Sequence, residues 1–120
     1  MWAVPRTVLI VDDHDTFRGA VRALLEVGGF VVIGEAVDGR QALVEVARLA
    51  PDIVLLDIQL PDLDGFAVAE RLAATSPSPT VVLVSSRDAV TYGDRLLRAP
   101  AAGFLPKREV TGATLAGILG

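Results

Sequence analysis

Three carboxylates stand at the ends of apolar runs that have the character of buried strands. Asp12 and Asp13 follow the run Thr7–Val11, and Asp57 ends the run that begins at Ile53. In open α/β sheets ligands bind at the carboxyl ends of the strands, so acids at these positions are candidates for a functional site. Three uncompensated carboxylates in one crevice would repel one another, and Mg²⁺ bound by one or two carboxylates and by waters is the ordinary remedy.

Two further polar side chains stand at the ends of later apolar runs. Ser85 ends the run that begins at Thr80, and Lys107 follows the run Ala102–Pro106. If these runs are neighbouring parallel strands, the hydroxyl and the ammonium reach the same edge of the sheet as the carboxylates. An acid cluster with a cation, a hydroxyl and an ammonium describes a site for a phosphoryl group on a carboxylate nucleophile. We therefore predict phosphoryl chemistry at Asp57.

These residues must be positioned by strands that alternate with helices along the whole chain. Apolar runs without polar alternation indicate strands that are covered on both faces, as in a parallel sheet. The predicted strands are 7–11, 30–37, 53–57, 80–85 and 102–106. The predicted helices begin at Asp15 or Thr16, after Asp38, after Asp64, at about Asp88 and at about Glu109.

Five strands alternating with five helices predict a flavodoxin-like α/β fold with a doubly wound parallel sheet, since parallel neighbours need crossover connections. The strand order 2-1-3-4-5 suits a chain with five strands and places its switch point between the first and third strands. This order brings Asp12 and Asp13 beside Asp57. We expect residues 1–120 to form a single domain, because the chain is large enough for one core and too small for two.

Composition excludes several classes of protein. A net charge of −4 and a pI near 4.8 argue against direct binding of nucleic acid by this domain. The apolar runs are too short to span a bilayer, and residues 1–7 lack the apolar core of a signal peptide. The absence of cysteine excludes disulfides and thiolate chemistry and fits a cytoplasmic protein.

The order and spacing of the motifs resemble those of a response regulator receiver domain, over essentially the whole chain. The resemblance rests on Val11–His14, Leu56–Asp57, Leu60–Gly65, Ser85–Ser86 and Gly103–Lys107. The Asp-Asp-His start and the Gly-Phe-Leu-Pro-Lys ending are most similar to receivers attached to LuxR-type helix-turn-helix domains. The resemblance implies a signalling domain of a two-component phosphorelay. Its partner would be a histidine kinase or a histidine phosphotransfer protein, and its own phosphorylation and dephosphorylation would be its only enzymatic activity.

The resemblance also implies a role for each polar residue of the site. Asp57 would be the phosphoacceptor, and Asp13 and Asp57 would bind Mg²⁺ together with the main-chain carbonyl of Gln59. Asp12 would act on the ion mostly through a water molecule. Lys107 would pair with the phosphoryl oxygens.

The same resemblance implies a conformational switch. Ser85 would be the switch hydroxyl and Phe104 the switch aromatic, and together they would change the surface of the fourth helix, the fifth strand and the fifth helix. A homodimer or a separate protein would bind there. LuxR-type relatives continue into a DNA-binding domain, whereas this sequence ends at Gly120, so the sequence leaves open whether the receiver stands alone.

Two other classes of function remain open at this point. An aspartyl-phosphate hydrolase usually carries a second acid two residues after its nucleophile, and Gln59 occupies that position here. A flavodoxin-like cofactor binder needs a phosphate-cradling loop after the first strand, and the acids Asp12 and Asp13 would repel a phosphate there. The residue pattern therefore favours the phosphoacceptor over both.

Three polar residues near the site have simpler interpretations. His14 is the only histidine, and we expect it at the start of the first helix without a chemical role. Asp62 is expected to be a solvated loop acid, and Asp64 is expected to cap the third helix.

Overall fold

The computed structural model describes residues 4–120; residues 1–3 of the expected domain lie outside the described part. One sheet of five parallel strands has the order β2-β1-β3-β4-β5. The strands are β1 (Thr7–Val11), β2 (Val31–Ala36), β3 (Ile53–Asp57), β4 (Thr80–Ser85) and β5 (Gly103–Pro106). The parallel sheet and the strand order predicted from the sequence are confirmed.

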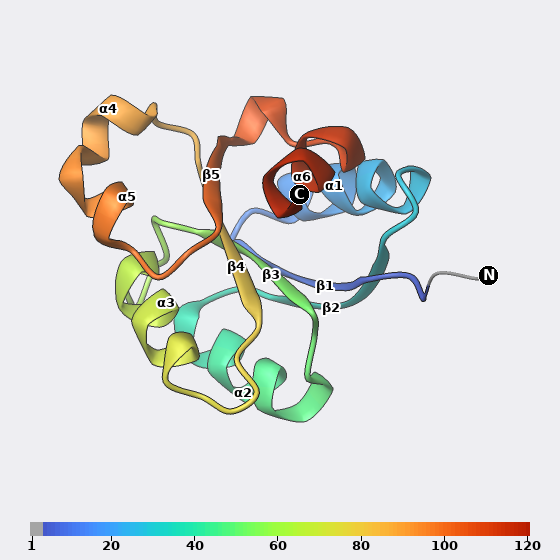
Figure 1. The fold of residues 1–120 in the computed structure, drawn as a ribbon, viewed down its shortest axis with the longest axis horizontal. Helices are drawn as coiled ribbons and strands as arrows, with labels where there is room; N and C mark the ends of the chain where they lie inside the picture. The colour runs from blue at the N-terminus through green and yellow to red at the C-terminus, as the bar shows by residue number, and fades with distance from the viewer. Residues whose placement is uncertain (1–3) are drawn as a thin grey trace.

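Helices cover both faces of the sheet (Figure 1). They are α1 (Asp15–Val27), α2 (Gly39–Leu49), α3 (Gly65–Ala73), α4 (Ala89–Tyr92), α5 (Asp94–Arg98) and α6 (Gly112–Leu119), with a short 3₁₀ helix, η1 (Lys107–Glu109). Helices α1 and α6 pack on one face, and α2 and α3 pack on the other (Figure 1). Over the described residues, none of these helices has the length and apolar character needed to cross a membrane.

The helices differ from the prediction at two places. The helix expected from Asp88 to Arg98 is divided into α4 and α5 at Gly93, whose φ of +55° lies in the left-handed region that favours glycine. Neither α4 nor α5 contains a fully buried residue, and only Tyr92 and Leu96 of these helices pack against the core, so little apolar burial supports one continuous helix. The last helix starts at Gly112 rather than near Glu109, because the Thr111 hydroxyl caps it by accepting the N–H of Thr114 at 3.0 Å.

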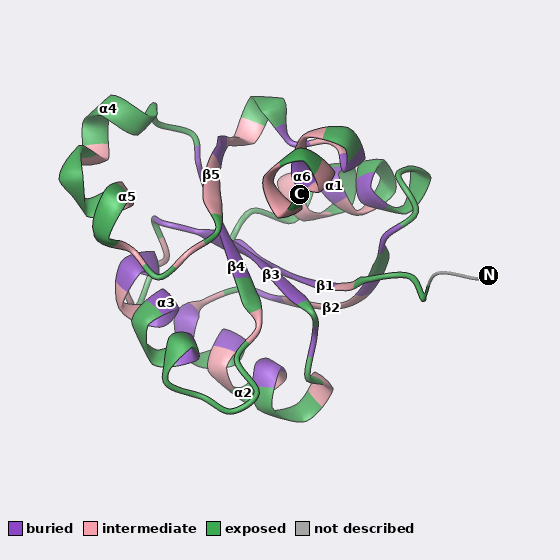
Figure 2. Ribbon diagram, viewed as in Figure 1, coloured by how far each residue is buried: buried purple, intermediate pink, exposed green. Residues whose placement is uncertain are grey.

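The core has two layers, one on each side of the sheet. All five residues of β3 are buried, because helices cover this strand from both sides (Figure 2). Alternate residues of β1 point to opposite layers: Leu9 packs with α2 and α3, whereas Ile10 packs with α1 and α6. The outward faces of the helices are exposed, and α4 and α5 are exposed over most of their length (Figure 2).

The register of the strands aligns the residues that follow them. Val11 of β1 pairs with Leu56 of β3, and Ser85 of β4 pairs with Pro106 of β5. The next residues along the chain therefore emerge at one edge of the sheet, which is the carboxyl edge of all five strands.

Candidate functional site

The acids predicted to converge lie together where β1 and β3 end. Asp12 is fully buried and Asp57 is 2% exposed, whereas the side chain of Asp13 is 36% exposed at the mouth of the site. One carboxylate oxygen of each acid and one ring nitrogen of His14 all lie within 4.8 Å of one another. The site therefore joins two buried carboxylates to a third that faces solvent.

Lys107, which follows β5, supplies the positive charge of the site. Its Nζ donates a hydrogen bond to Oδ2 of Asp57 at 3.1 Å and lies 2.5 Å from Oδ2 of Asp12. The second contact lacks the geometry of a hydrogen bond, and Oδ2 of Asp12 has no hydrogen-bond partner among the described residues. The ammonium also lies 4.7 Å from the centre of the Phe17 ring, which helps to hold it in place. Burial lowers the pKa of Lys107, but the contacts with Asp12 and Asp57 outweigh burial and raise the pKa above its usual value.

The surroundings of Asp57 disfavour its charged form. Burial and then the charge of Asp12 raise the pKa of Asp57 to about 6, against the opposing effects of the Gln59 N–H and Lys107. The Gln59 N–H donates to Oδ1 of Asp57 at 3.1 Å, and the side chain of Gln59 is exposed. The site thus holds three acids, of which the Lys107 ammonium contacts Asp12 and Asp57, and one buried oxygen of Asp12 lacks a hydrogen-bond donor among the described residues. The carboxylate oxygens of these acids, and their excess negative charge, fit a hard divalent cation such as Mg²⁺.

The turn after β3 is fixed by a glycine and a cap. A Cβ atom on Gly65 would lie 2.5 Å from the carbonyl oxygen of Asp57 and 2.6 Å from Cα of Ile58, so only glycine allows this approach. Asp64 caps α3, as expected, by accepting the N–H of Phe66 at 2.7 Å. The first residue of α3 therefore lies directly against the backbone of Asp57.

Asp62 is an exposed loop acid, as expected, but it also makes contacts that the sequence did not suggest. Its carboxylate accepts the backbone N–H groups of Gly39 at 2.8 Å and Arg40 at 3.0 Å, which begin α2. Desolvation raises the pKa of Asp62, but these bonds and the one from Leu63 outweigh it and lower the pKa. Asp62 thus ties the loop after β3 to the start of α2, a contact between distant segments that local pattern does not reveal.

His14 stands at the start of α1, as expected, but it also contacts the acids. Its Nδ1 lies 3.0 Å from Oδ1 of Asp12 and 3.1 Å from Oδ1 of Asp13. Sequence reasoning missed this contact. The available signal was the position of His14 directly after the two acids.

Ser85 lies at the end of β4 and is fully buried. Its Oγ accepts the N–H of Arg87 at 3.0 Å and lies 2.6 Å from the hydroxyl oxygen of Tyr92. The Tyr92 ring meets the rings of Phe66 and half-buried Phe104 edge-on, with centroids 5.7 Å and 6.3 Å away. The predicted pair Ser85 and Phe104 is thus connected through Tyr92, which sequence reasoning did not single out.

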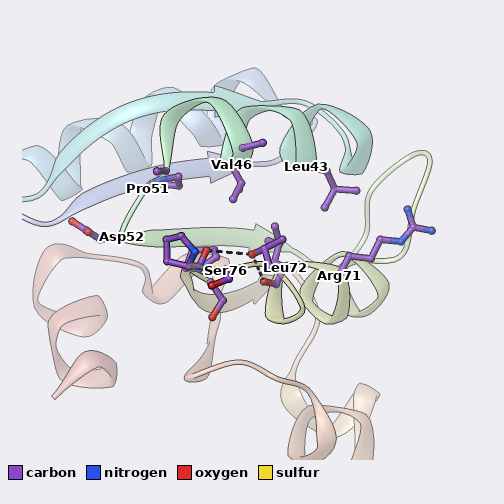
Figure 3. A pocket seen from close by; sticks show the side chains of 13 residues that line it. Leu43, Val46, Pro51, Asp52, Arg71, Leu72 and Ser76 are labelled. Atoms are coloured by element: carbon purple, nitrogen blue, oxygen red, sulfur yellow. Dashed lines mark hydrogen bonds between the residues drawn. The ribbon is translucent and has the colours of Figure 1, made fainter.

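A separate hollow lies at the opposite end of the sheet (Figure 3). Its volume is about 630 Å³, and its walls include Val46 of α2, Leu72 of α3 and Pro51. Asp52, which directly precedes β3, also lines it, so the hollow is at the amino ends of the strands. None of the predicted site residues lines it.

Comparison with known proteins identifies the family of this fold and site. Residues 8–117 match the response regulator receiver domain. The response regulator GacA of Pseudomonas viridiflava is 38% identical over 101 residues, which are 83% of this chain and 47% of GacA. This chain belongs to the receiver domain family of two-component signal transduction, and the resemblance predicted from its motifs is confirmed. The chain spans about half the length of the curated relatives it matches.

Solved structures agree with this result. The signal receiver domain of a Mycobacterium tuberculosis response regulator given the name NarL is 34% identical, with a TM-score of 0.85 over 98% of this chain and 99% of that one. A LuxR-family two-component response regulator from Aurantimonas sp. SI85-9A1 shares the fold, with a TM-score of 0.84 at 24% identity over 98% of this chain and 87% of that one.

Proposed function

We propose that this domain accepts a phosphoryl group on Asp57 from a histidine kinase or a histidine phosphotransfer protein. The observation that carries the proposal is the buried Asp57 carboxylate, held between the Gln59 N–H on one oxygen and the Lys107 ammonium on the other. An oxygen of Asp57 forms a bond to phosphorus while the bond from phosphorus to the donor's imidazole nitrogen breaks, and that nitrogen keeps the electron pair. The raised pKa of Asp57 makes its carboxylate more basic, while a value of about 6 still leaves most of it ionised at neutral pH.

Lys107 and the acids have different roles in the proposed transfer. The Lys107 ammonium lies beside the oxygen of Asp57 and can pair with the phosphoryl oxygens that gain charge in the transition state. Asp12, Asp13, Asp57 and the main-chain carbonyl of Gln59 would hold Mg²⁺, and the ion when bound would neutralise carboxylate and phosphoryl charge.

A signalling role is favoured over hydrolysis of a substrate. Gln59 occupies the position where an aspartyl-phosphate hydrolase carries its general acid, and an amide cannot transfer a proton in that way. The family match supports a receiver over a flavin-binding module. We place residues 1–120 in one receiver domain that works in the cytoplasm.

The proposed output surface comprises α4, α5, β5 and α6, which correspond to the expected fourth helix, fifth strand and fifth helix. Val90 of α4 and Leu97 of α5 are 88% and 85% exposed, so this surface offers apolar side chains to a partner. Arg98 and Arg108 are exposed nearby and are paired with Asp94 and Asp88, so charges of both signs are present. Phosphorylation would change this surface through Ser85 and Phe104, and a second copy of the domain or another protein would bind it.

Phosphorylation by acetyl phosphate with Mg²⁺ tests the proposed function. We expect intact-mass spectrometry to detect one added phosphoryl group per chain, and we expect Asp57→Asn to abolish the addition. Asp94→Asn is the matched control, because Asp94 is exposed on α5 outside the acid cluster and its carboxylate pairs with Arg98 at 3.4 Å. Labelling of Asp57→Asn at the level of the parent would contradict the proposal.

A further inference from the structure

The Ser85 hydroxyl already has partners before any phosphoryl group arrives. Its oxygen accepts the N–H of Arg87 and shares a 2.6 Å hydrogen bond with the Tyr92 hydroxyl. In the proposed function, Ser85 must turn its hydroxyl toward a phosphoryl oxygen on Asp57. Rotation about χ1 carries Oγ from one staggered position to another, and therefore away from its present place beside Tyr92.

Tyr92 cannot simply follow the serine, because its ring is held between two others. Phe66 of α3 and Phe104 of β5 both meet it edge-on. The hydrogen bond is therefore lost when Ser85 turns, and the tyrosine hydroxyl is left without this partner.

The same tyrosine secures α4 to the domain. Ala89, Val90 and Thr91 are exposed, so Tyr92 is the one residue of this helix that is partly buried. Gly93, in the left-handed region, follows it directly and separates α4 from α5. Loss of the Tyr92 hydrogen bond therefore weakens the main attachment of α4. Because the Tyr92 ring packs edge-on against Phe104, a looser α4 also changes the surroundings of Phe104.

We propose that Tyr92 is a latch. Its hydroxyl holds Ser85 in the position that Ser85 has before Asp57 is phosphorylated, and loss of the hydrogen bond between Ser85 and Tyr92 transmits the change at Ser85 to Phe104 and to α4. This inference rests on the proposed phosphoacceptor function and adds the residue that connects its two switch positions. Tyr92 is a positioning residue, since it acts on Asp57 only through Ser85.

Beryllofluoride, a mimic of the phosphoryl group, tests the latch in the presence of Mg²⁺. Tyr92→Phe keeps the ring and removes only the hydroxyl, so the aromatic packing and the fold are retained. We expect this variant to bind beryllofluoride about two- to tenfold more tightly than the parent, because no Ser85 hydrogen bond must be given up. In a Ser85→Ala background the same change should have no effect, since the latch has lost its other half.

A second readout follows from the composition, because Tyr92 is the only tyrosine of the chain. In protein labelled with 3-fluorotyrosine, the single ¹⁹F resonance of the tyrosine should shift when beryllofluoride binds, and Ser85→Ala should reduce that shift. An unchanged resonance at saturation, or equal or weaker affinity of Tyr92→Phe, would overturn the latch. Failure of the parent to bind beryllofluoride, or undiminished binding by Asp57→Asn, would instead overturn the proposed function, and the latch would fall with it.

Discussion

At the residue scale, the negative charge of the buried Asp57 carboxylate destabilises the folded state of the metal-free domain. Burial and the neighbouring Asp12 raise the pKa of Asp57 from 3.8 to about 6. The folded state therefore prefers the protonated carboxyl, and the free energy of unfolding falls as the pH rises from about 3.8 through about 6. Lys107 stays protonated throughout this range and does not alter the sign.

Asp57→Asn should consequently stabilise the metal-free domain at neutral pH. We expect the free energy of unfolding to rise by about 1–3 kcal/mol at about pH 7 and by clearly less at about pH 4.5, because the asparagine removes a charge that is absent from the folded parent at low pH. Urea denaturation of both proteins in EDTA at the two pH values measures the difference. A gain of equal size at both values would show that the charge of Asp57 is not its source.

At the scale of elements, the start of α3 against β3 depends on one glycine. Gly65→Ala should lower the free energy of unfolding by about 1–3 kcal/mol, since the new methyl group meets backbone atoms of Asp57 and Ile58. Gly19→Ala in α1 is the matched control, because a Cβ atom at Gly19 would have nothing within 4 Å, and alanine there should stabilise the helix by about 0.5–1 kcal/mol. Urea unfolding of the two variants should give shifts of opposite sign. A Gly65→Ala domain as stable as the parent would contradict the close approach.

The elements themselves were largely predictable, and the exceptions have a common physical cause. Buried strands such as Ile53–Asp57 and caps such as Asp64 are determined locally, by runs of apolar residues and by a side chain that bonds the next turn. The strand order then placed Asp12, Asp13, Asp57 and Lys107 together without further information. The contacts of Asp62 and Tyr92 were missed because their partners belong to other elements. The sequence pattern of α4, or of the loop after β3, cannot show contacts with other segments.

At the scale of the whole molecule, the three most exposed large apolar side chains beyond Val4 in the described part of the chain lie on two different faces and are alternative contact surfaces. Val90 and Leu97 lie on α4 and α5, and Val27, which is 90% exposed, lies at the end of α1 on the opposite face. If the output surface is the one proposed, beryllofluoride should promote self-association in the parent and in Val27→Asp but not in Val90→Asp. Sedimentation velocity measures this, with beryllofluoride binding as the check that each variant keeps its site. Loss of association in Val27→Asp alone would move the interface to α1.

The parallel order of the sheet also governs how the chain must fold. No two neighbouring strands are joined by a tight turn: each pair encloses at least one helix, and the central pair of β1 and β3 encloses α1, β2 and α2. The conformational entropy of these long loops is lost before the strands gain any pairing contacts. The sheet therefore lacks a local folding nucleus of the kind that a β-hairpin provides. Because β1 pairs with both β2 and β3, the first half of the chain contains a complete three-stranded platform with helices for both faces. The strands β4 and β5 extend this platform at its β3 edge, so Asp12 and Asp57 belong to the three-stranded part of the sheet, whereas Lys107 follows the edge strand β5.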